Sequence, residues 1–111
     1  MEVSTRQFRR CDLVKATGRI DSQTAPRLAE ALQEIIDAGR YRIVLDMSDV
    51  DFVSSAGLRV MINMQKQCKR WNRGQVVLAG VRPQLYSTME LVGFLPLFKI
   101  FDNATEAVAS F

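Results

Sequence analysis

The sequence predicts an α/β fold: one domain with a mostly parallel sheet of four to five strands, an N-terminal pairing of strands and about four helices. Short apolar runs rich in β-branched residues alternate with segments of helical periodicity. This alternation is typical of parallel strands joined by right-handed crossovers. The length of 111 residues matches one domain of common size. No linker, repeat or low-complexity stretch interrupts the chain, so residues 1–111 are expected to form that single domain.

The first elements expected are a strand hairpin and a helix. The hairpin pairs residues 2–8 with residues 12–17. The helix has Thr24 as its N-cap, Pro26 in its first turn and Gly39 just past its C-terminus. Its buried face is expected to consist of Leu28, Leu32, Ile35 and Ile36, which recur at helical spacing.

The middle of the chain is expected to form a central strand and a second helix. Residues 42–47, RIVLDM, are an apolar run typical of a strand covered on both faces. A tight turn and residues 50–53 follow. Ser54 or Ser55 then begins a helix that is expected to run to about Arg73.

The last third of the chain repeats this alternation. Residues 75–79 are a buried strand, residues 82–93 a helix and residues 97–101 the last strand. Asn103 is expected to cap a short terminal helix, with Glu106 as the other half of a capping box. The helix at 82–93 is expected to present Leu85, Met89 and Val92.

The helix that begins at the two serines has an unusually wide apolar surface. Its core face is expected to contain Leu58, Met61, Ile62, Gln65 and Cys68. Val60, Met64 and Trp71 flank that face and widen the apolar arc to roughly 200°. Two explanations stay open: a neighbouring helix covers the extra residues, or they belong to a surface that binds a partner.

The composition argues against several classes of function. The chain is 48% apolar and 24% charged, as ordinary globular proteins are, and it contains no histidine, the commonest general base and metal ligand. The net charge of +3 is mild. The one basic cluster (Lys66, Lys69, Arg70 and Arg73) is explained by the favourable position of cations at a helix C-terminus. We therefore expect no nucleic-acid partner, no metal and no cofactor.

The sequence also indicates in which cellular compartment the protein is found. No apolar run approaches the ~20 residues that span a bilayer, and the first ten residues lack the apolar core of a signal peptide. Cys11 and Cys68 do not form a CxxC pair and are expected to act as small apolar side chains. These features predict a cytoplasmic protein without membrane insertion.

A serine at the start of a helix has an ordinary structural role, because its side chain caps a free backbone N–H. Its surroundings here suggest a further role. Gly57 lies in the first turn, where glycine is a poor helix former but lets another chain approach closely. Asp21 lies in the earlier strand-to-helix turn, and Asp46, Asp49 and Asp51 lie at a predicted strand end and turn. Such turns meet at the C-terminal edge of a parallel sheet, where α/β folds place their sites.

Catalysis by these serines is not expected. The sequence offers no histidine to activate a serine, and VSSAG is not the GxSxG elbow of serine hydrolases. None of the six glycines falls in the GxxxxGK[ST] order of a phosphate-binding loop. The chain is therefore predicted not to be an enzyme.

Three segments resemble a known family. They are GRIDSQTA, IVLDMSDVDFVSSAGLRV and LVGF…FKIFDNATEAV. Together they are similar to the STAS-domain anti-sigma factor antagonists of bacterial partner-switching systems, over essentially the full length. The middle segment is the most specific, because this family has a strand, an aspartate, a short turn and an aromatic residue, and then a serine and a glycine that open a helix.

The resemblance implies a switch. The serine two residues before the glycine, here Ser55, is phosphorylated in this family by an anti-sigma factor that is also a serine kinase. The unphosphorylated form binds that anti-sigma factor and releases the sigma factor, and a PP2C-type phosphatase resets the switch. The family commonly has aspartate where this chain has Ser54, so Ser54 is an alternative acceptor. Asp21 and Asp46 match acidic positions that the family keeps near the site.

The partner-binding surface is expected to comprise Asp21, Ser54, Ser55, Ala56, Gly57, Arg59, Val60 and Met64. A phosphate is favourable at a helix N-terminus, so switching is expected to act through charge and bulk at this surface and not through unfolding. One alternative is a STAS subunit of a membrane lipid or anion transporter, without phosphorylation. Another is a small enzyme or nucleotide-binding protein on a Rossmann-like scaffold, for which the sequence has no fingerprint.

Overall fold

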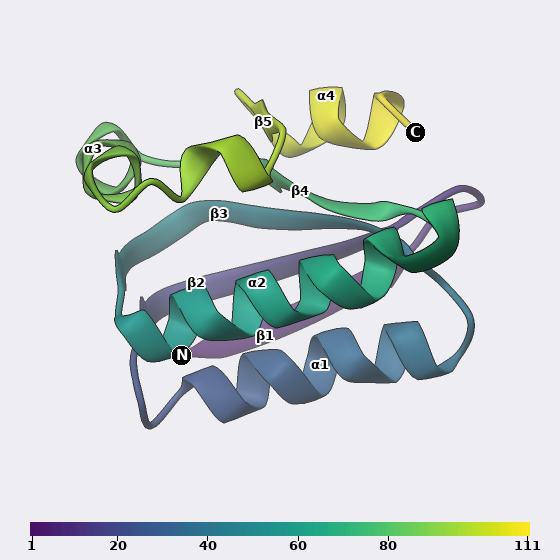
Figure 1. Cartoon of the computed structure of the whole chain (residues 1–111), viewed down its shortest axis with the longest axis horizontal. Coiled ribbons are helices and arrows are strands. Elements are labelled where there is room, and N and C mark those ends of the chain that lie inside the picture. Colours follow the sequence, from purple (N-terminus) through teal and green to yellow (C-terminus); the bar gives the residue numbers. More distant parts are fainter.

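Five strands form one sheet in the computed structural model, which describes all residues 1–111 (Figure 1). Their order in the sheet is their order in the chain: β1 (Glu2–Gln7), β2 (Asp12–Ile20), β3 (Arg42–Val53), β4 (Gln75–Ala79) and β5 (Ile100–Phe101). β1 and β2 pair antiparallel, and every other pair is parallel. The predicted α/β fold, with its N-terminal strand pairing, is confirmed.

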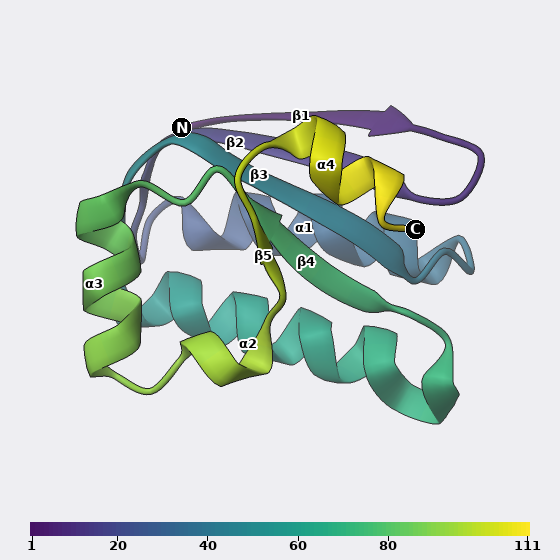
Figure 2. The same cartoon turned by 90° about the horizontal axis from the view of Figure 1, so that it is seen from above.

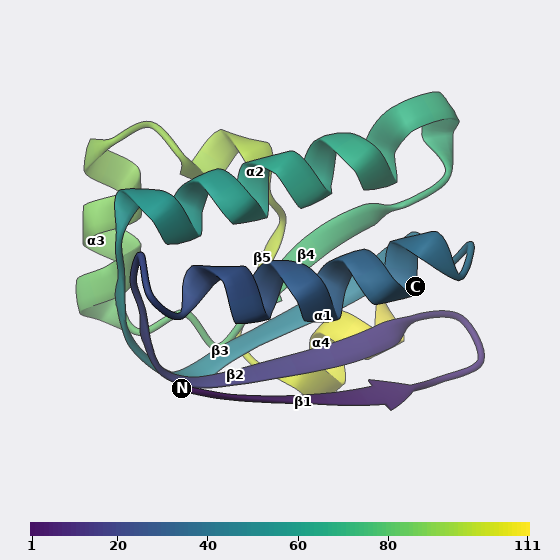
Figure 3. The same ribbon diagram turned by 90° about the horizontal axis from the view of Figure 1, so that it is seen from below.

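Four helices cover the sheet unequally. α1 (Ala25–Asp37) and α2 (Ser55–Lys69) lie side by side on one face, and α4 (Ala104–Ala109) lies on the other (Figures 1 and 3). α3 (Pro83–Leu91) lies at the end of the sheet where β3 leads into α2 (Figure 2). Two 3₁₀ turns, η1 (Arg70–Asn72) and η2 (Leu95–Leu97), follow α2 and α3.

The central strand β3 is buried on both faces, which explains why RIVLDM is apolar without alternation. Ile43 and Leu45 point into the main core beneath α1 and α2. Val44 belongs to a smaller cluster with Ala107 of α4. The predicted buried face of α1, formed by Leu28, Leu32, Ile35 and Ile36, is confirmed.

Gln65 is the buried polar side chain of the α2 core face. Its amide nitrogen donates to the carbonyl oxygens of Val76 (3.0 Å) and Leu97 (2.8 Å), and its amide oxygen accepts from the Val76 N–H (2.6 Å). Since these groups satisfy one another, the burial costs little, and α2 is fixed to both β4 and η2.

The strand β3 differs from the expectation of two segments joined by a tight turn. The ladder with β2 continues to the pair Ile20–Val53, through register shifts between Lys15 and Thr17 and between Gly18 and Arg19. Such irregularities bend two strands together without breaking their pairing. The predicted turn is therefore wrong, and the chain stays extended until Val53.

Three other boundaries also differ from expectation. α2 ends at Lys69 and not near Arg73, because Trp71 and Asn72 adopt left-handed backbone angles (φ 57° and 55°). The last strand is only Ile100–Phe101, because η2, which contains Pro96, occupies the start of the predicted run. Val92, expected within the third helix, lies just beyond the end of α3 and is 61% exposed.

Candidate functional site at the start of helix α2

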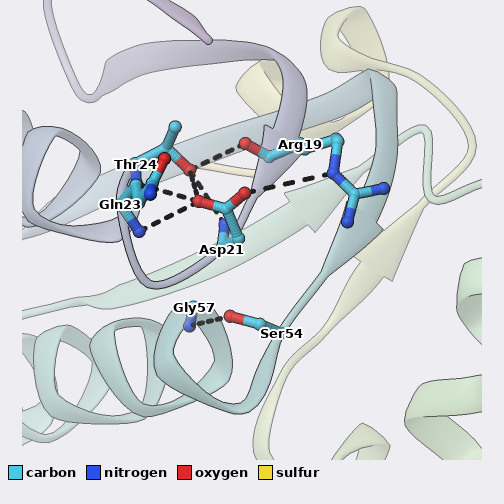
Figure 4. A network of polar contacts seen from close by, with 6 residues as sticks. All are labelled: Arg19, Asp21, Gln23, Thr24, Ser54 and Gly57. Carbon is cyan, nitrogen blue, oxygen red and sulfur yellow. Dashed lines mark hydrogen bonds and ion pairs between the residues drawn. The ribbon is translucent and has the colours of Figure 1, made fainter.

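Ser54 holds the start of α2 in place. Its backbone is extended and its N–H donates to the carbonyl oxygen of Ile20 at 2.7 Å, at the end of β2. Its hydroxyl oxygen accepts from the Gly57 N–H at 3.3 Å, as Figure 4 shows. Ser54 is therefore the N-cap, one of the two serines at which the sequence predicts the helix to begin.

Ser55 is different from its neighbour. It is the first residue of α2, it is exposed, and its hydroxyl makes no hydrogen bond within the chain. Two adjacent serines thus have separate environments: the hydroxyl of Ser54 is used by the fold, and the hydroxyl of Ser55 faces solvent.

Asp21 forms the turn that leads from β2 to α1, directly beside the two serines. Its Oδ1 accepts from the backbone N–H groups of Gln23 (3.0 Å) and Thr24 (3.1 Å). These bonds lower the pKa of the Asp21 carboxyl, with a smaller contribution from the charge of Arg19. The carboxylate stays ionised and the turn is fixed in shape.

Thr24 is the N-cap residue of α1, as expected, but its side chain makes no capping hydrogen bond. The Thr24 hydroxyl makes no bond to a first-turn N–H of α1. It accepts from the Asp21 N–H and donates to the Arg19 carbonyl oxygen, both at 2.8 Å. The reason is the Asp21 turn, which draws the threonine back toward the end of β2 (Figure 4).

Gly57 is buried, and its role differs from the one expected. A Cβ at this position would lie 2.7 Å from Cγ2 of Ile20 and 2.9 Å from Cγ1 of Val53. The glycine therefore lets α2 begin directly against the ends of β2 and β3. The close approach that the sequence suggested is made by the chain itself and not by a partner.

An open groove of about 570 Å³ lies between α1 and α2 and runs along α2 from Ala56 to Lys66. Ala56, Arg59 and Val60 line it from α2, and Ser22 and Pro26 line it from the start of α1. Arg59 is exposed, and Ala56 and Val60 are half-buried. The groove begins one residue after Ser55, so a partner that contacts this serine also meets the groove.

Met64 was placed with Val60 on the flank of the helix. It is only 3% exposed and belongs to the main core, so its side chain lies at the floor of the groove. A neighbouring helix, α1, covers this part of the apolar arc. Trp71 is fully outside the groove, beyond the other end of α2.

The upstream aspartates do not gather at the serines as expected. Asp46, Asp49 and Asp51 all lie within β3, because the predicted turn does not exist. Asp46 is buried and accepts from the Ser48 N–H at 3.0 Å. Asp49 pairs with Lys15 at 3.1 Å, which raises the pKa of that lysine. Only Asp21 lies in a turn beside Ser54.

Arg19 and Phe52 were not singled out from the sequence. They are opposite residues in the β2–β3 ladder, and the Arg19 guanidinium lies 4.3 Å from the centre of the Phe52 ring. The same guanidinium lies 4.0 Å from Asp21. Together they add a cation and a partly exposed aromatic ring next to the Asp21 turn. Their pairing depends on the strand register, which the sequence alone did not define.

The chain contains no group of three or more acidic or cysteine side chains arranged to hold a metal ion. None of its helices has the length and apolar character needed to cross a membrane.

Residues 2–107 match the model of the STAS domain family. The chain belongs to this family. BtrV of Bordetella bronchiseptica, which is described as an anti-sigma factor antagonist, is 35% identical to this STAS domain over 94 residues, 85% of this chain and 80% of that protein. The anti-sigma-B factor antagonist of Listeria monocytogenes is 27% identical over 100 residues, 90% of this chain and 86% of that protein. The STAS domain is thus a member of the anti-sigma factor antagonists, which are regulators and not enzymes.

Solved structures share the fold of this STAS domain. An anti-sigma factor antagonist from Thermotoga maritima superposes with a TM-score of 0.88 at 19% identity, over 97% of this chain and 92% of that chain. The Bacillus cell fate determinant SpoIIAA in its phosphorylated form gives 0.76 at 14% identity and covers 98% of both chains. A sulfate transporter family protein from Wolinella succinogenes gives 0.79 at 22% identity, over 93% of this chain and 85% of that chain. The resemblance inferred from the three sequence segments is confirmed by the family match and by these relatives.

Proposed function

We propose that this STAS domain is a phosphorylation-controlled antagonist in which Ser55 accepts the phosphate. The unphosphorylated form binds an anti-sigma factor that is also a serine kinase, and the sigma factor is released. Phosphorylation of Ser55 by that kinase ends the binding, and a PP2C-type phosphatase restores it. This exchange takes place in the cytoplasm.

The different environments of the two serines carry this proposal. A kinase needs a hydroxyl that it can reach, and Ser55 offers one that is exposed and free of hydrogen bonds. The Ser54 hydroxyl is half-buried and caps the helix. Phosphorylation of Ser54 would remove the cap, so the alternative acceptor is less favoured than the sequence alone suggested.

The site also suits a charge switch. A phosphate on Ser55 would lie at the N-terminus of α2, where the helix dipole stabilises negative charge. Arg59 lies four residues further along the helix, which places it on the same side as Ser55. The modification therefore leaves the fold intact and changes the charge and bulk of the exposed surface.

The partner surface is proposed to comprise Ser55, Ala56, Arg59 and Val60, together with the Asp21 turn. These residues border one groove or lie directly beside it. Ser54, Gly57 and Met64 support this surface from beneath by capping, close packing and core burial. Substitutions of the surface residues should therefore change binding, and substitutions of the supporting residues should change stability.

Affinity measurement with a purified switch kinase from the same bacterium tests the proposal. Wild type and Ser55→Ala should bind, whereas Ser55→Asp should lose most of the affinity while its circular dichroism and thermal midpoint stay unchanged. Arg27→Ala, which alters an exposed arginine of α1 outside the groove, is the matched control and should bind like wild type. Unimpaired binding by Ser55→Asp, or a loss explained by unfolding, would contradict the proposal. Failure of every form to bind the kinase would favour a STAS subunit of a transporter.

A further inference from the structure

Trp71, the only tryptophan of the chain, lies beyond the end of α2 that is opposite to Ser55. Its side chain is 74% exposed and its backbone is left-handed (φ 57°, ψ 31°). A large side chain rarely adopts this conformation, and here it presents an apolar ring to solvent. Neither the fold nor the Ser55 site uses this ring.

The ring is held by arginines. The guanidinium carbons of Arg70 and Arg73 lie 4.3 Å and 5.3 Å from the centre of the Trp71 ring, within cation–π range. Arg73 also lies 3.8 Å from the centre of the Tyr41 ring and donates to the carbonyl oxygens of Gln67 (2.7 Å) and Arg70 (3.0 Å). The aromatic and guanidinium groups are therefore already in place before anything binds.

Further basic side chains surround Trp71 and its two arginines. The loop between β1 and β2, the loop between α1 and β3, and the end of α2 meet at one end of the molecule (Figures 1 and 3). Two recesses there are bordered by Arg9, Arg10, Arg40, Arg42, Lys69, Arg73 and Lys99. The single acidic residue among their lining residues is Asp12, and it is already paired with Arg40. The other cations in the recesses have no carboxylate partner.

We propose that this end of the molecule is a second protein-binding surface, and that its partner is an acidic segment carrying apolar side chains. We define the Trp71 surface as Tyr41, Arg42, Lys69, Arg70, Trp71 and Arg73. Tryptophan, tyrosine and arginine are the residue types that dominate binding energy at protein interfaces. Arginine also binds carboxylates through two parallel hydrogen bonds. The Arg73 guanidinium already donates within the chain, but those of Arg42 and Arg70 do not, so an acidic chain complements them in charge and in geometry.

Other polyanions fit the Trp71 surface less well. Single-stranded nucleic acid binds along a series of stacking rings, and here the one exposed indole already has two guanidinium groups near it. A membrane surface would require more apolar area than one ring. Of the other exposed large apolar side chains, Leu97 borders a recess with Lys69 and Arg70, whereas Phe52, Tyr86, Leu91 and Val92 lie in other elements.

The Trp71 surface is separate from the Ser55 site. Ser55 and Lys69 are the two ends of α2, so about 21 Å of helix lies between them. A partner at one end leaves the other end free, and the proposal for the Trp71 surface does not depend on phosphorylation of Ser55.

Two labelled peptides of equal length and equal negative charge test this inference by fluorescence anisotropy. One alternates glutamate with leucine, and the other alternates glutamate with serine. The leucine peptide should bind at least about fivefold more tightly and should shift the Trp71 emission to shorter wavelength. A thymine oligonucleotide and phosphatidylglycerol vesicles should shift that emission only at higher concentrations.

Two variants complete the test. Trp71→Gly suits the left-handed backbone and should stay folded, and it should reduce the preference for the leucine peptide to within about twofold. Tyr86→Ala, an exposed aromatic of α3, should leave the preference unchanged. Equal binding of both peptides, an unchanged preference in Trp71→Gly, or tighter binding of the oligonucleotide or the vesicles would overturn the proposal.

Discussion

The backbone N–H of Ser54 donates a 2.7 Å hydrogen bond to the carbonyl oxygen of Ile20. This bond extends the contact between β2 and β3 to the N-cap residue of α2. Because Asp21 follows Ile20 directly, its turn is fixed beside the first turn of α2 (Figure 4). The same geometry uses the Ser54 hydroxyl for the helix and leaves the Ser55 hydroxyl free.

Substitutions of Ser54 and Ser55 should differ in their effect on the free energy of unfolding. Ser54→Ala removes the N-cap and should lower the free energy of unfolding by about 1 kcal/mol, whereas Ser54→Asp keeps a capping oxygen and should cost much less. Ser55→Ala removes an exposed hydroxyl and should stay within about 0.5 kcal/mol of wild type. Urea denaturation measures all three. Equal losses for the two alanine variants would contradict the different roles of the serines.

Gly57→Ala should destabilise the domain although alanine favours helices. The added Cβ would meet the Ile20 and Val53 side chains at 2.7 Å and 2.9 Å, and both are stiff at χ1. We expect a net loss of about 1–2 kcal/mol in the free energy of unfolding. Gly39→Asn is the control, because its side chain would enter open space and asparagine tolerates the positive φ. A more stable Gly57→Ala variant would show that α2 can move away from the sheet.

The fold was largely predictable because its signals are local. Apolar runs marked β3 and β4, and the cap at Asn103 is confirmed by its 2.9 Å bond from the Glu106 N–H. The expected capping box is incomplete, because the Glu106 side chain makes no hydrogen bond to the Asn103 N–H. The misjudged features depend on contacts between distant segments. The register shifts that carry β3 past Met47 arise from pairing with β2, and the burial of Met64 arises from packing against α1.

In the site, too, local sequence signals identified the residues, and contacts between distant segments decided their roles. The sequence pointed to Ser54, Ser55 and the Asp21 turn, but it could not say which serine caps the helix, because either hydroxyl could do so. The bond between Ser54 and Ile20, which joins distant segments, positions Ser54 as the cap of the first helical turn. The left-handed backbone at Trp71 also has no local sequence signal, since tryptophan rarely adopts it.

Asp21 should make the stability depend on pH. Backbone bonds from Thr24 and Gln23 lower its pKa in the folded state. A lowered carboxyl pKa stabilises the fold above the unfolded pKa, and this contribution is lost as the pH falls through the folded pKa. Asp21→Asn keeps an accepting oxygen but loses the charge, so its urea midpoint should lie below wild type at neutral pH, and the gap should close in acid.

Asp51→Asn is the control for this pH series, because Asp51 is exposed and makes no hydrogen bond or ion pair. Its urea midpoint should stay close to that of wild type. A constant gap between Asp21→Asn and wild type across that range would contradict the role of the charge.

Both cysteines should be unreactive in the folded protein. Burial raises the pKa of the Cys68 thiol to about 11, and it raises the pKa of Cys11 as well. Since the thiolate is the reactive form, a thiol reagent should label neither residue until denaturant is added. Rapid labelling of Cys68 under native conditions would show that α2 opens locally.

Intact-mass analysis and peptide mapping after incubation with the switch kinase and ATP test the central claim most directly. Wild type and Ser54→Asp should each gain one phosphate, and in both it should map to Ser55. Ser55→Ala should gain none, although its fold and the Ser54 cap are unchanged. Phosphorylation of Ser55→Ala, or a wild-type protein that gains no phosphate from a kinase it binds, would contradict the account.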